Sequence, residues 1–133
     1  MNIPSRLLVS LPFVILSLCV DQQAAAETLS AEMAKNLVSG HTWVRKPTNA
    51  VAVSYWSWKS DGTVCLRLFD KQGKCDDTGR WKMDGERVCY ELGWWGGTWG
   101  IKSACFRVSD LGKGRYEALE DNGIVQFEFT VSK

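Results

Sequence analysis

The chain of 133 residues contains one histidine, His41, which is the first candidate for a catalytic base. A hydrolase triad needs a nucleophile, a base and an orienting acid that the fold brings together. Ser39 and Ser54 are available as nucleophiles, but neither lies in the Gly-x-Ser-x-Gly motif of a nucleophile elbow. His41 directly follows a predicted helix, and this position favours a structural or solvent-exposed role. We therefore expect no catalytic residue and no enzyme activity, and a small hydrolase is the less favoured alternative.

Two pairs of acidic residues, Asp76-Asp77 and Glu120-Asp121, are the second candidate for chemistry. Two carboxylates across a cleft can hydrolyse a glycosidic bond. Adjacent acids in turns that contain glycine are usually solvated, and neither pair has the spacing of a calcium-binding loop. We expect both pairs to be solvated loop residues, and we predict no metal site and no cofactor.

Four cysteines, Cys65, Cys75, Cys89 and Cys105, follow the N-terminal segment. An even number in an exported chain predicts a disulfide framework, and four cysteines allow three pairings among which sequence alone does not choose. We favour Cys65–Cys75 with Cys89–Cys105, because each pair closes a short loop worth roughly 3 kcal/mol in the chain-entropy model. A zinc site is disfavoured because the chain has no Cys-x-x-Cys pair and its histidine is distant in sequence.

The first 26 residues have the three features of a secretory signal peptide. Arg6 supplies a positive charge, Leu7–Val20 is mainly apolar, and Ala24-Ala25-Ala26 matches an Ala-x-Ala cleavage pattern. The apolar run is too short for a transmembrane helix, which needs about 20 residues. Cleavage after Ala26 predicts a periplasmic or secreted protein in which residues 27–133 form one domain.

Lipidation is an alternative use of the same segment, with Cys19 as the modified residue. Leu18 stands before this cysteine, at a position where a small residue is expected, so we disfavour a lipoprotein.

The charge balance excludes one class of function. Removal of Arg6 and Asp21 with the signal peptide leaves the formal net charge at +1, the value for the whole chain. A nucleic-acid-binding domain would show a basic patch or stripe. We therefore expect no nucleic-acid partner.

One short helix is predicted within residues 27–40. Ser30 is suited to the N-cap position and Gly40 to the position after the C-cap. An apolar face recurs at every fourth residue, in Leu29, Met33 and Leu37. Because the helix is short, it needs a surface on which to dock.

After Gly40 the hydrophobic period changes to two, which is typical of strands. The strand-like segments include 51–58, 63–69, 80–84, 87–93, 104–110, 115–119 and 124–131. Arg67, Lys82 and Arg107 alternate outward and are expected to be solvated. Short polar turns at regular spacing predict a mainly β fold of about eight strands, a small up-and-down antiparallel barrel-like meander with one short N-terminal helix at one end.

The predicted hairpin of the segments 87–93 and 104–110 supports one cysteine pair. In that hairpin both cysteines lie on the face opposite a set of apolar residues, namely Val88, Tyr90, Phe106 and Val108. Directly opposed Cβ atoms are about 4.5–5.5 Å apart, a separation that modest adjustment bridges.

Several of these motifs resemble a family of secreted bacterial proteins, the domain of unknown function 995. The shared features are "LSAEMAKNLVSGHTW", "YWSWKSDGTV", "GRWKMDGERVCYEL", a second "CF" strand, "GRYEAL" and "FEFTV", which span Leu29 to Val131. The pairing of Cys89 with Cys105 fits this pattern, whereas Cys65–Cys75 and the Trp-rich loop look like additions. The resemblance implies fold and export and lends no activity.

A second resemblance is to small bacterial inhibitors of secreted metalloproteases, which are lipocalin-like barrels with an early disulfide. The segment "CLRLFDKQGKC" is similar to that feature. The inhibitory N-terminal trunk of those proteins has no match in this chain. Protease inhibition is therefore an alternative function.

The stretch "GWWGGTWG" at positions 93–100 is the most specific indication of function. Tryptophans are enriched at binding hot spots, and glycines let a backbone approach a ligand. The same loop could instead fold its rings over an open barrel end and stabilise the core. We expect an exported binding domain whose protein or carbohydrate partner contacts Trp94, Trp95 and Trp99, together with Trp56 or Trp58. A purely structural envelope protein is a further alternative.

Overall fold

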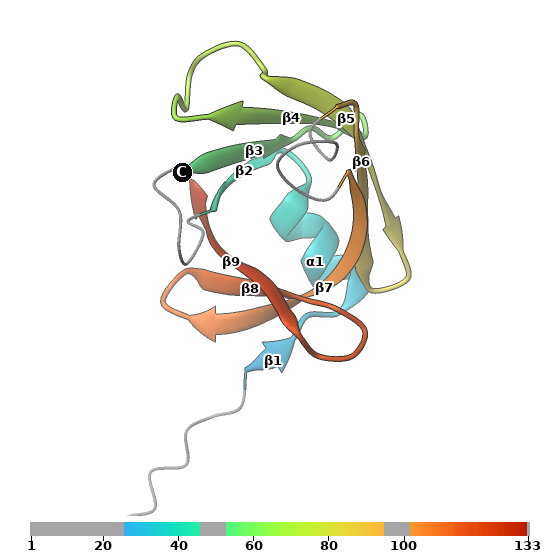
Figure 1. The fold of residues 1–133 in the computed structure, drawn as a ribbon. Helices are drawn as coiled ribbons and strands as arrows, with labels where there is room; N and C mark the ends of the chain where they lie inside the picture. Colours follow the sequence, from blue (N-terminus) through green and yellow to red (C-terminus); the bar gives the residue numbers. More distant parts are fainter. Residues whose placement is uncertain (1–25, 46–52, 95–101, 133) are drawn as a thin grey trace, which may run out of the picture.

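The computed structural model describes residues 26–45, 53–94 and 102–132. Within them, eight strands form a closed antiparallel barrel (Figure 1). The strands are β2 (His41–Arg45), β3 (Ser54–Trp58), β4 (Thr63–Leu68), β5 (Asp77–Asp84), β6 (Arg87–Leu92), β7 (Ser103–Gly112), β8 (Arg115–Leu119) and β9 (Val125–Ser132). The strand β1 (Glu27–Thr28) and the helix α1 (Ala31–Val38) precede them.

Each barrel strand pairs with the next strand along the chain, and β9 returns to pair with β2. The closing ladder runs from Thr42 opposite Ser132 to Arg45 opposite Phe129. The strand β1 lies outside this cycle and pairs with β7. The predicted mainly β, up-and-down barrel with one short helix is confirmed.

The helix α1 has the predicted caps. The Ser30 hydroxyl accepts a hydrogen bond from the Met33 backbone N–H, and Gly40 has a φ of +79°, which favours glycine. The side chains buried on the barrel are Ala34 and Val38. Leu29, Met33 and Leu37 share one face, as predicted, and line the same groove, with Met33 56% exposed.

The position of α1 explains why Ala34 and Val38 are its buried side chains. The helix contacts β2 and β6, and Figure 1 shows it within the ring of strands. The Trp43 indole N–H donates to the Leu37 carbonyl at 3.2 Å and so joins the helix to β2. The small side chain of Ala34 permits a close approach between helix and barrel, which a methionine at the same place would prevent.

The barrel interior is filled by a cluster of aromatic rings. The Trp43 ring stacks on the Phe129 ring with centroids 3.8 Å apart, and it lies 4.8 Å from the Trp58 ring. The other large rings of the cluster are Trp56, Trp81, Tyr90 and Phe106. Interdigitated rings of this size supply most of the apolar area that the small domain buries.

Trp56 and Trp58 belong to this core, so their predicted role in contacting a partner is wrong. Trp56 is 4% exposed and Trp58 is 1% exposed. Alternation along β3 turns these rings inward, where they are cross-strand partners of Leu66 and Val64 on β4. A partner at the barrel surface does not reach them.

The favoured disulfide pairing is present in the structure. Cys65 is bonded to Cys75, and Cys89 is bonded to Cys105. The second pair joins residues that lie directly opposite each other on β6 and β7, as the hairpin predicted. Two disulfides indicate an oxidising environment.

The predicted signal peptide falls almost entirely on residues 1–25, outside the described residues. In the described part of the chain, no helix has the length and apolar character needed to cross a membrane.

Candidate functional site

In an up-and-down barrel, every second connection lies at the same end. The strands β2, β4 and β6 therefore end where β3, β5 and β7 begin. We call this end the mouth and mark it by Arg45, Leu68, Asp77 and Trp94. The helix α1 leads into the start of β2 and lies at the opposite end.

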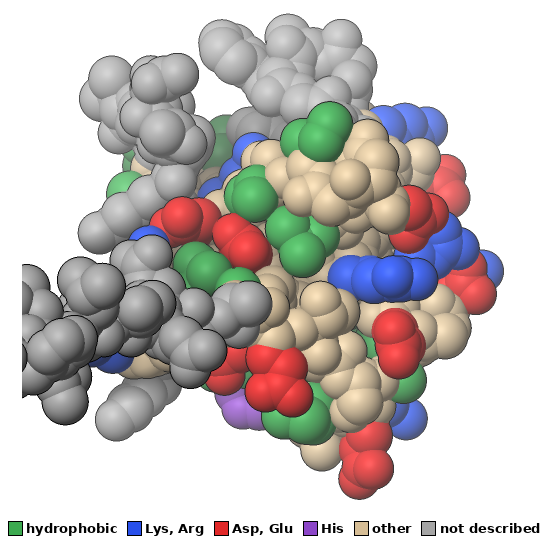
Figure 2. Space-filling view, turned by 90° about the horizontal axis from the view of Figure 1, so that it is seen from below, with side chains coloured by type: hydrophobic (Ala, Val, Ile, Leu, Met, Phe, Trp, Pro, Cys, Tyr) green, Lys and Arg blue, Asp and Glu red, His purple; other side chains and the backbone are tan. Residues whose placement is uncertain are grey.

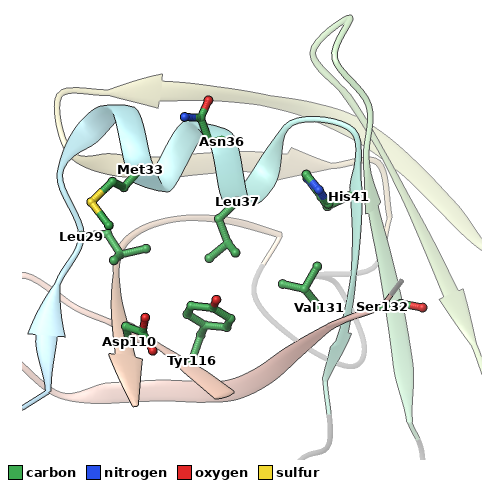
Figure 3. A pocket seen from close by; sticks show the side chains of 9 residues that line it. All are labelled: Leu29, Met33, Asn36, Leu37, His41, Asp110, Tyr116, Val131 and Ser132. Atoms are coloured by element: carbon green, nitrogen blue, oxygen red, sulfur yellow. The ribbon is translucent and has the colours of Figure 1, made fainter. Parts of the chain in front are cut away.

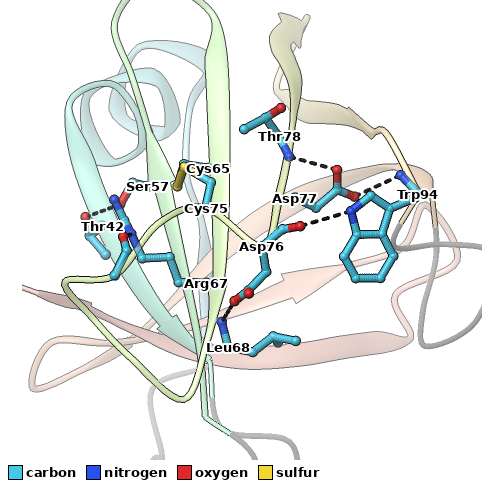
Figure 4. Close-up of a disulfide and its surroundings, with 11 residues drawn as sticks. Thr42, Ser57, Cys65, Arg67, Leu68, Cys75, Asp76, Asp77, Thr78 and Trp94 are labelled. Atoms are coloured by element: carbon cyan, nitrogen blue, oxygen red, sulfur yellow. Dashed lines mark hydrogen bonds between the residues drawn. A yellow bond between two sulfur atoms is a disulfide. The ribbon is translucent and has the colours of Figure 1, made fainter.

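Trp94 lies at the mouth, directly after β6, and its ring is on the surface. The side chain is 51% exposed. Its indole N–H donates to the Asp76 carbonyl at 2.9 Å, and its backbone N–H donates to the Asp77 carboxylate at 3.0 Å (Figure 4). The residue is thus held at two points, its ring by Asp76 and its backbone by Asp77, the first residue of β5.

The Asp77 carboxylate stabilises this contact. Its carboxylate is only 5% exposed and accepts hydrogen bonds from three backbone N–H groups, those of Thr78, Gly93 and Trp94. Such charge-assisted bonds offset the cost of burying a carboxylate. The prediction that Asp77 is a solvated loop residue is wrong, because Asp77 begins β5 and is buried. Gly93 and Trp94, two of its partners, lie 16 and 17 residues away along the chain, so no local pattern indicated the contact.

Gly79 lets β5 and β6 approach each other beside this carboxylate. A Cβ atom at Gly79 would lie 1.9 Å from the carbonyl oxygen of Glu91. Only glycine fits at such a distance. This close approach positions the end of β6, and with it Trp94, next to Asp77.

A second exposed aromatic residue, Phe69, follows β4 at the mouth. Phe69 is 73% exposed and has a φ of +66°, a conformation that a phenylalanine rarely adopts. The preceding Leu68 N–H donates to the Asp76 carboxylate at 2.7 Å. Asp76 therefore ties the strand end before Phe69 to the indole of Trp94, and strain of this kind is typical of functional loops.

The loop between β4 and β5 is further fixed by the Cys65–Cys75 bond and by Arg67. The Arg67 guanidinium donates to the Gly73 carbonyl and to the Ser57 hydroxyl, each at 2.8 Å (Figure 4). The Ser57 hydroxyl also lies 2.8 Å from the hydroxyl of Thr42. Arg67 was expected to be solvated and is instead half-buried in this network. Arg107 and Lys82 are exposed, as expected.

Of the residues predicted to meet a partner, Trp94 lies on the surface and Trp56 and Trp58 lie in the core. Trp95 and Trp99 fall outside the described residues. The second acidic pair behaves as expected at Asp121, which is exposed and pairs with Arg87 at 3.0 Å.

Sequence reasoning missed Arg45 and Tyr90. Arg45 ends β2 and shares the inward face with Trp43, and its guanidinium carbon lies 4.5 Å from the centroid of the Phe127 ring. Burial lowers the pKa of Arg45, an effect that its interaction with Tyr90 opposes, and burial raises the pKa of Tyr90. The alternation of "HTWVR" could have predicted that Arg45 faces the interior, because Trp43 and Arg45 are two residues apart on one strand.

A groove of about 600 Å³ lies near the opposite end, between α1 and the strands β7 to β9 (Figure 3). Leu37, Tyr116 and Val131 form its apolar part, and His41 lies at one end. His41 Nδ1 is 3.0 Å from the Ser39 carbonyl. In a catalytic triad, a carboxylate accepts the hydrogen bond that the Ser39 carbonyl occupies in this structure. Asp110 lines the same groove but lies at the end far from His41 (Figure 3).

The surface chemistry is mixed. Figure 2 shows acidic and basic side chains interspersed on one face, with hydrophobic side chains in small groups between them. In the described ranges, no group of three or more histidine, cysteine, aspartate or glutamate side chains is arranged to hold a metal ion. What distinguishes the mouth is a pair of exposed aromatic side chains, Phe69 and Trp94, of which Trp94 is held by a hydrogen bond from its indole.

The chain was compared with family models, curated proteins and solved structures, and none of the three comparisons gives a match. The two family resemblances read from the sequence stay predictions.

Proposed function

We propose that this protein is an exported binding domain whose partner or ligand docks on the mouth of the barrel. The observation that carries the proposal is the half-exposed Trp94 ring, whose indole N–H donates to the Asp76 carbonyl while the Trp94 backbone N–H donates to the Asp77 carboxylate. The predicted signal peptide and the two disulfides support export to the periplasm or the exterior.

The energetics of binding explain why such a ring is suited to recognition. A binding surface loses free energy when its side chains become ordered, by about 0.5–1.5 kcal/mol for each immobilised flexible side chain. Trp94 is already fixed, so most of this cost is met during folding. A rigid indole on the surface also supplies a large apolar face with a polar edge, the property that makes tryptophan frequent at hot spots.

The ligand class that fits is one with an apolar or ring-shaped face, in a carbohydrate or in a protein side chain. Phe69 offers a second exposed apolar side chain on the neighbouring loop, and Asp76 forms hydrogen bonds to both loops.

The experiment compares three forms of the oxidised protein on a panel of soluble oligosaccharides and secreted proteins. Trp94→Ala removes the ring, whereas Met33→Ala removes an equally exposed apolar side chain at the other end. We expect a panel member whose Kd rises about tenfold or more in Trp94→Ala, the range of a hot-spot residue, and is unchanged in Met33→Ala. A panel without a ligand, or a ligand that binds Trp94→Ala as well as wild type, would contradict the proposal.

Protease inhibition is the second candidate, and the closed eight-stranded barrel with a disulfide across residues 65–75 favours it. Both features are implied by the resemblance to lipocalin-like inhibitors. Stoichiometric block of a secreted metalloprotease distinguishes this function from binding of a carbohydrate.

A further inference from the structure

Arg45 carries a positive charge into the mouth of the barrel, where the described residues give it no acidic partner. Its side chain is partly buried, its Nε atom is buried, and this atom has no hydrogen-bond partner. Within the described residues, the groups that interact with the guanidinium are the Phe127 ring and the Tyr90 phenol. Neither group neutralises a cation.

An arrangement of this kind is costly for folding alone. A buried donor without a partner destabilises the folded state, and more so when the group is charged. A cation over an aromatic ring recovers only part of this loss. Two arginines elsewhere on the barrel do have acidic partners, because Arg87 pairs with Asp84 and Asp121, and Arg115 pairs with Glu128.

We propose that Arg45 is the anion-binding residue of the mouth and that the natural ligand presents a carboxylate on an apolar body. This inference rests on the proposed function, since it specifies the ligand that docks beside Trp94. The planar guanidinium matches a carboxylate in shape, and its single charge matches a monoanion. A phosphate dianion would bring a second negative charge to a guanidinium that carries a single positive charge.

The aromatic residues near Arg45 indicate that the rest of the ligand is apolar. Phe127 covers one face of the guanidinium and packs edge-on against Phe106, with ring centroids 5.4 Å apart. Trp94 and Phe69 offer exposed apolar surface at the same end of the barrel. A carboxylate would approach the edge of the guanidinium in its plane, while the apolar body lies against the exposed rings.

The test uses phenylacetate, its neutral isostere phenylacetamide, and inorganic phosphate as probes of the oxidised, ¹⁵N-labelled protein. The Arg45 Nε–H resonance reports on the site directly. We expect phenylacetate to shift this resonance to saturation and to bind about tenfold or more tightly than phenylacetamide, the ratio for hydrogen bonds to a charged group. Arg45→Gln is expected to reduce that ratio to about one, whereas Arg115→Gln, which removes an exposed paired arginine, leaves it unchanged.

Several results would overturn the inference. These are equal affinity of the acid and the amide, an unshifted Arg45 resonance, a ratio that survives Arg45→Gln, or phosphate that saturates the site at lower concentration than phenylacetate. Should Arg45→Gln fail to fold, Arg45→Lys takes its place, because it keeps the charge and loses the planar fork. A merely structural Arg45 would change stability in these variants without creating any preference for the acid.

Trp94→Ala separates this inference from the proposed function. If the acid-to-amide ratio is high and Trp94→Ala weakens both compounds equally, both proposals hold. If the ratio is about one while Trp94→Ala still weakens a ligand from the panel, the role of Arg45 is wrong and the mouth remains a binding surface. If the ratio is high and Trp94→Ala has no effect, the Trp94 surface is wrong and the Arg45 site stands.

Discussion

Replacing Trp43 with alanine is expected to lower the free energy of unfolding by about 3–5 kcal/mol, the range for a large aromatic residue in a core. The ring is almost completely buried, stacks on Phe129 and contacts Trp58. The substitution also removes the indole donor to the Leu37 carbonyl, which joins α1 to the barrel. Urea denaturation of the oxidised protein, followed by far-ultraviolet circular dichroism, measures the loss without depending on tryptophan fluorescence.

Trp94→Ala is the matched control, since it makes the same change at an exposed site. We expect it to cost about 1 kcal/mol or less, because half of the side chain is solvated and its single indole hydrogen bond is exposed. Equal losses for the two variants would show that the two rings are equally buried. That result would contradict the division between a core tryptophan and a surface tryptophan.

Removing the Cys89–Cys105 bond with the double substitution Cys89→Ala and Cys105→Ala is expected to cost about 2–5 kcal/mol. The bond closes a loop with a sequence separation of 16 and crosses between paired strands, so its loss enlarges the unfolded ensemble. Thermal and urea unfolding of the double variant, compared with oxidised wild type, measures the effect.

The matched control is the double substitution Cys65→Ala and Cys75→Ala, which opens a loop with a sequence separation of 10. Loop-closure entropy alone predicts a loss smaller by roughly 0.4 kcal/mol for this pair. Unchanged stability in both double variants, or labelling of unreduced wild type by iodoacetamide, would show that the bonds do not form in solution.

The local parts of the fold were predictable from sequence, and the reason is physical. Turn residues and period-two alternation act over a few neighbouring positions, so the hairpins and the caps of α1 at Ser30 and Gly40 followed from residue types. The pairing of β9 with β2, which closes the barrel, joins Thr42 to Ser132 and has no local determinant. Only the meander as a whole indicated it.

The choice of the inward face of β3 was not predictable from the alternation of residues alone. Tyr55 and Trp56 are adjacent, so each face of that strand carries an aromatic ring and the pattern alone does not choose between them. The choice is made by β4, whose apolar residue Leu66 lies opposite Trp56. Assigning Trp56 and Trp58 to a binding surface was therefore an error of face rather than of secondary structure.

The candidate site was predictable in part for the same reason. The composition of the loop after β6 indicated an unusual surface at Trp94. Two features depend on contacts between strands distant in sequence. These are the Asp77 carboxylate that fixes the loop and the Arg45 guanidinium, whose Nε has no hydrogen-bond partner among the described residues. In the sequence, Asp77 has no feature that separates it from an ordinary acidic loop residue, because Gly93 and Trp94 contact it only in the folded chain.

The most direct test of the account is acrylamide quenching of tryptophan fluorescence in oxidised wild type and in Trp94→Phe. We expect Trp94 to contribute a readily quenched component of the fluorescence, which disappears in Trp94→Phe. The free energy of unfolding of that variant is expected to stay within about 1 kcal/mol of wild type. The indoles of Trp43, Trp56 and Trp58, which are buried, are expected to stay shielded in both proteins. A quenching profile that is the same in Trp94→Phe, or a large loss of stability in that variant, would show that Trp94 belongs to the core and would contradict a binding surface at the mouth.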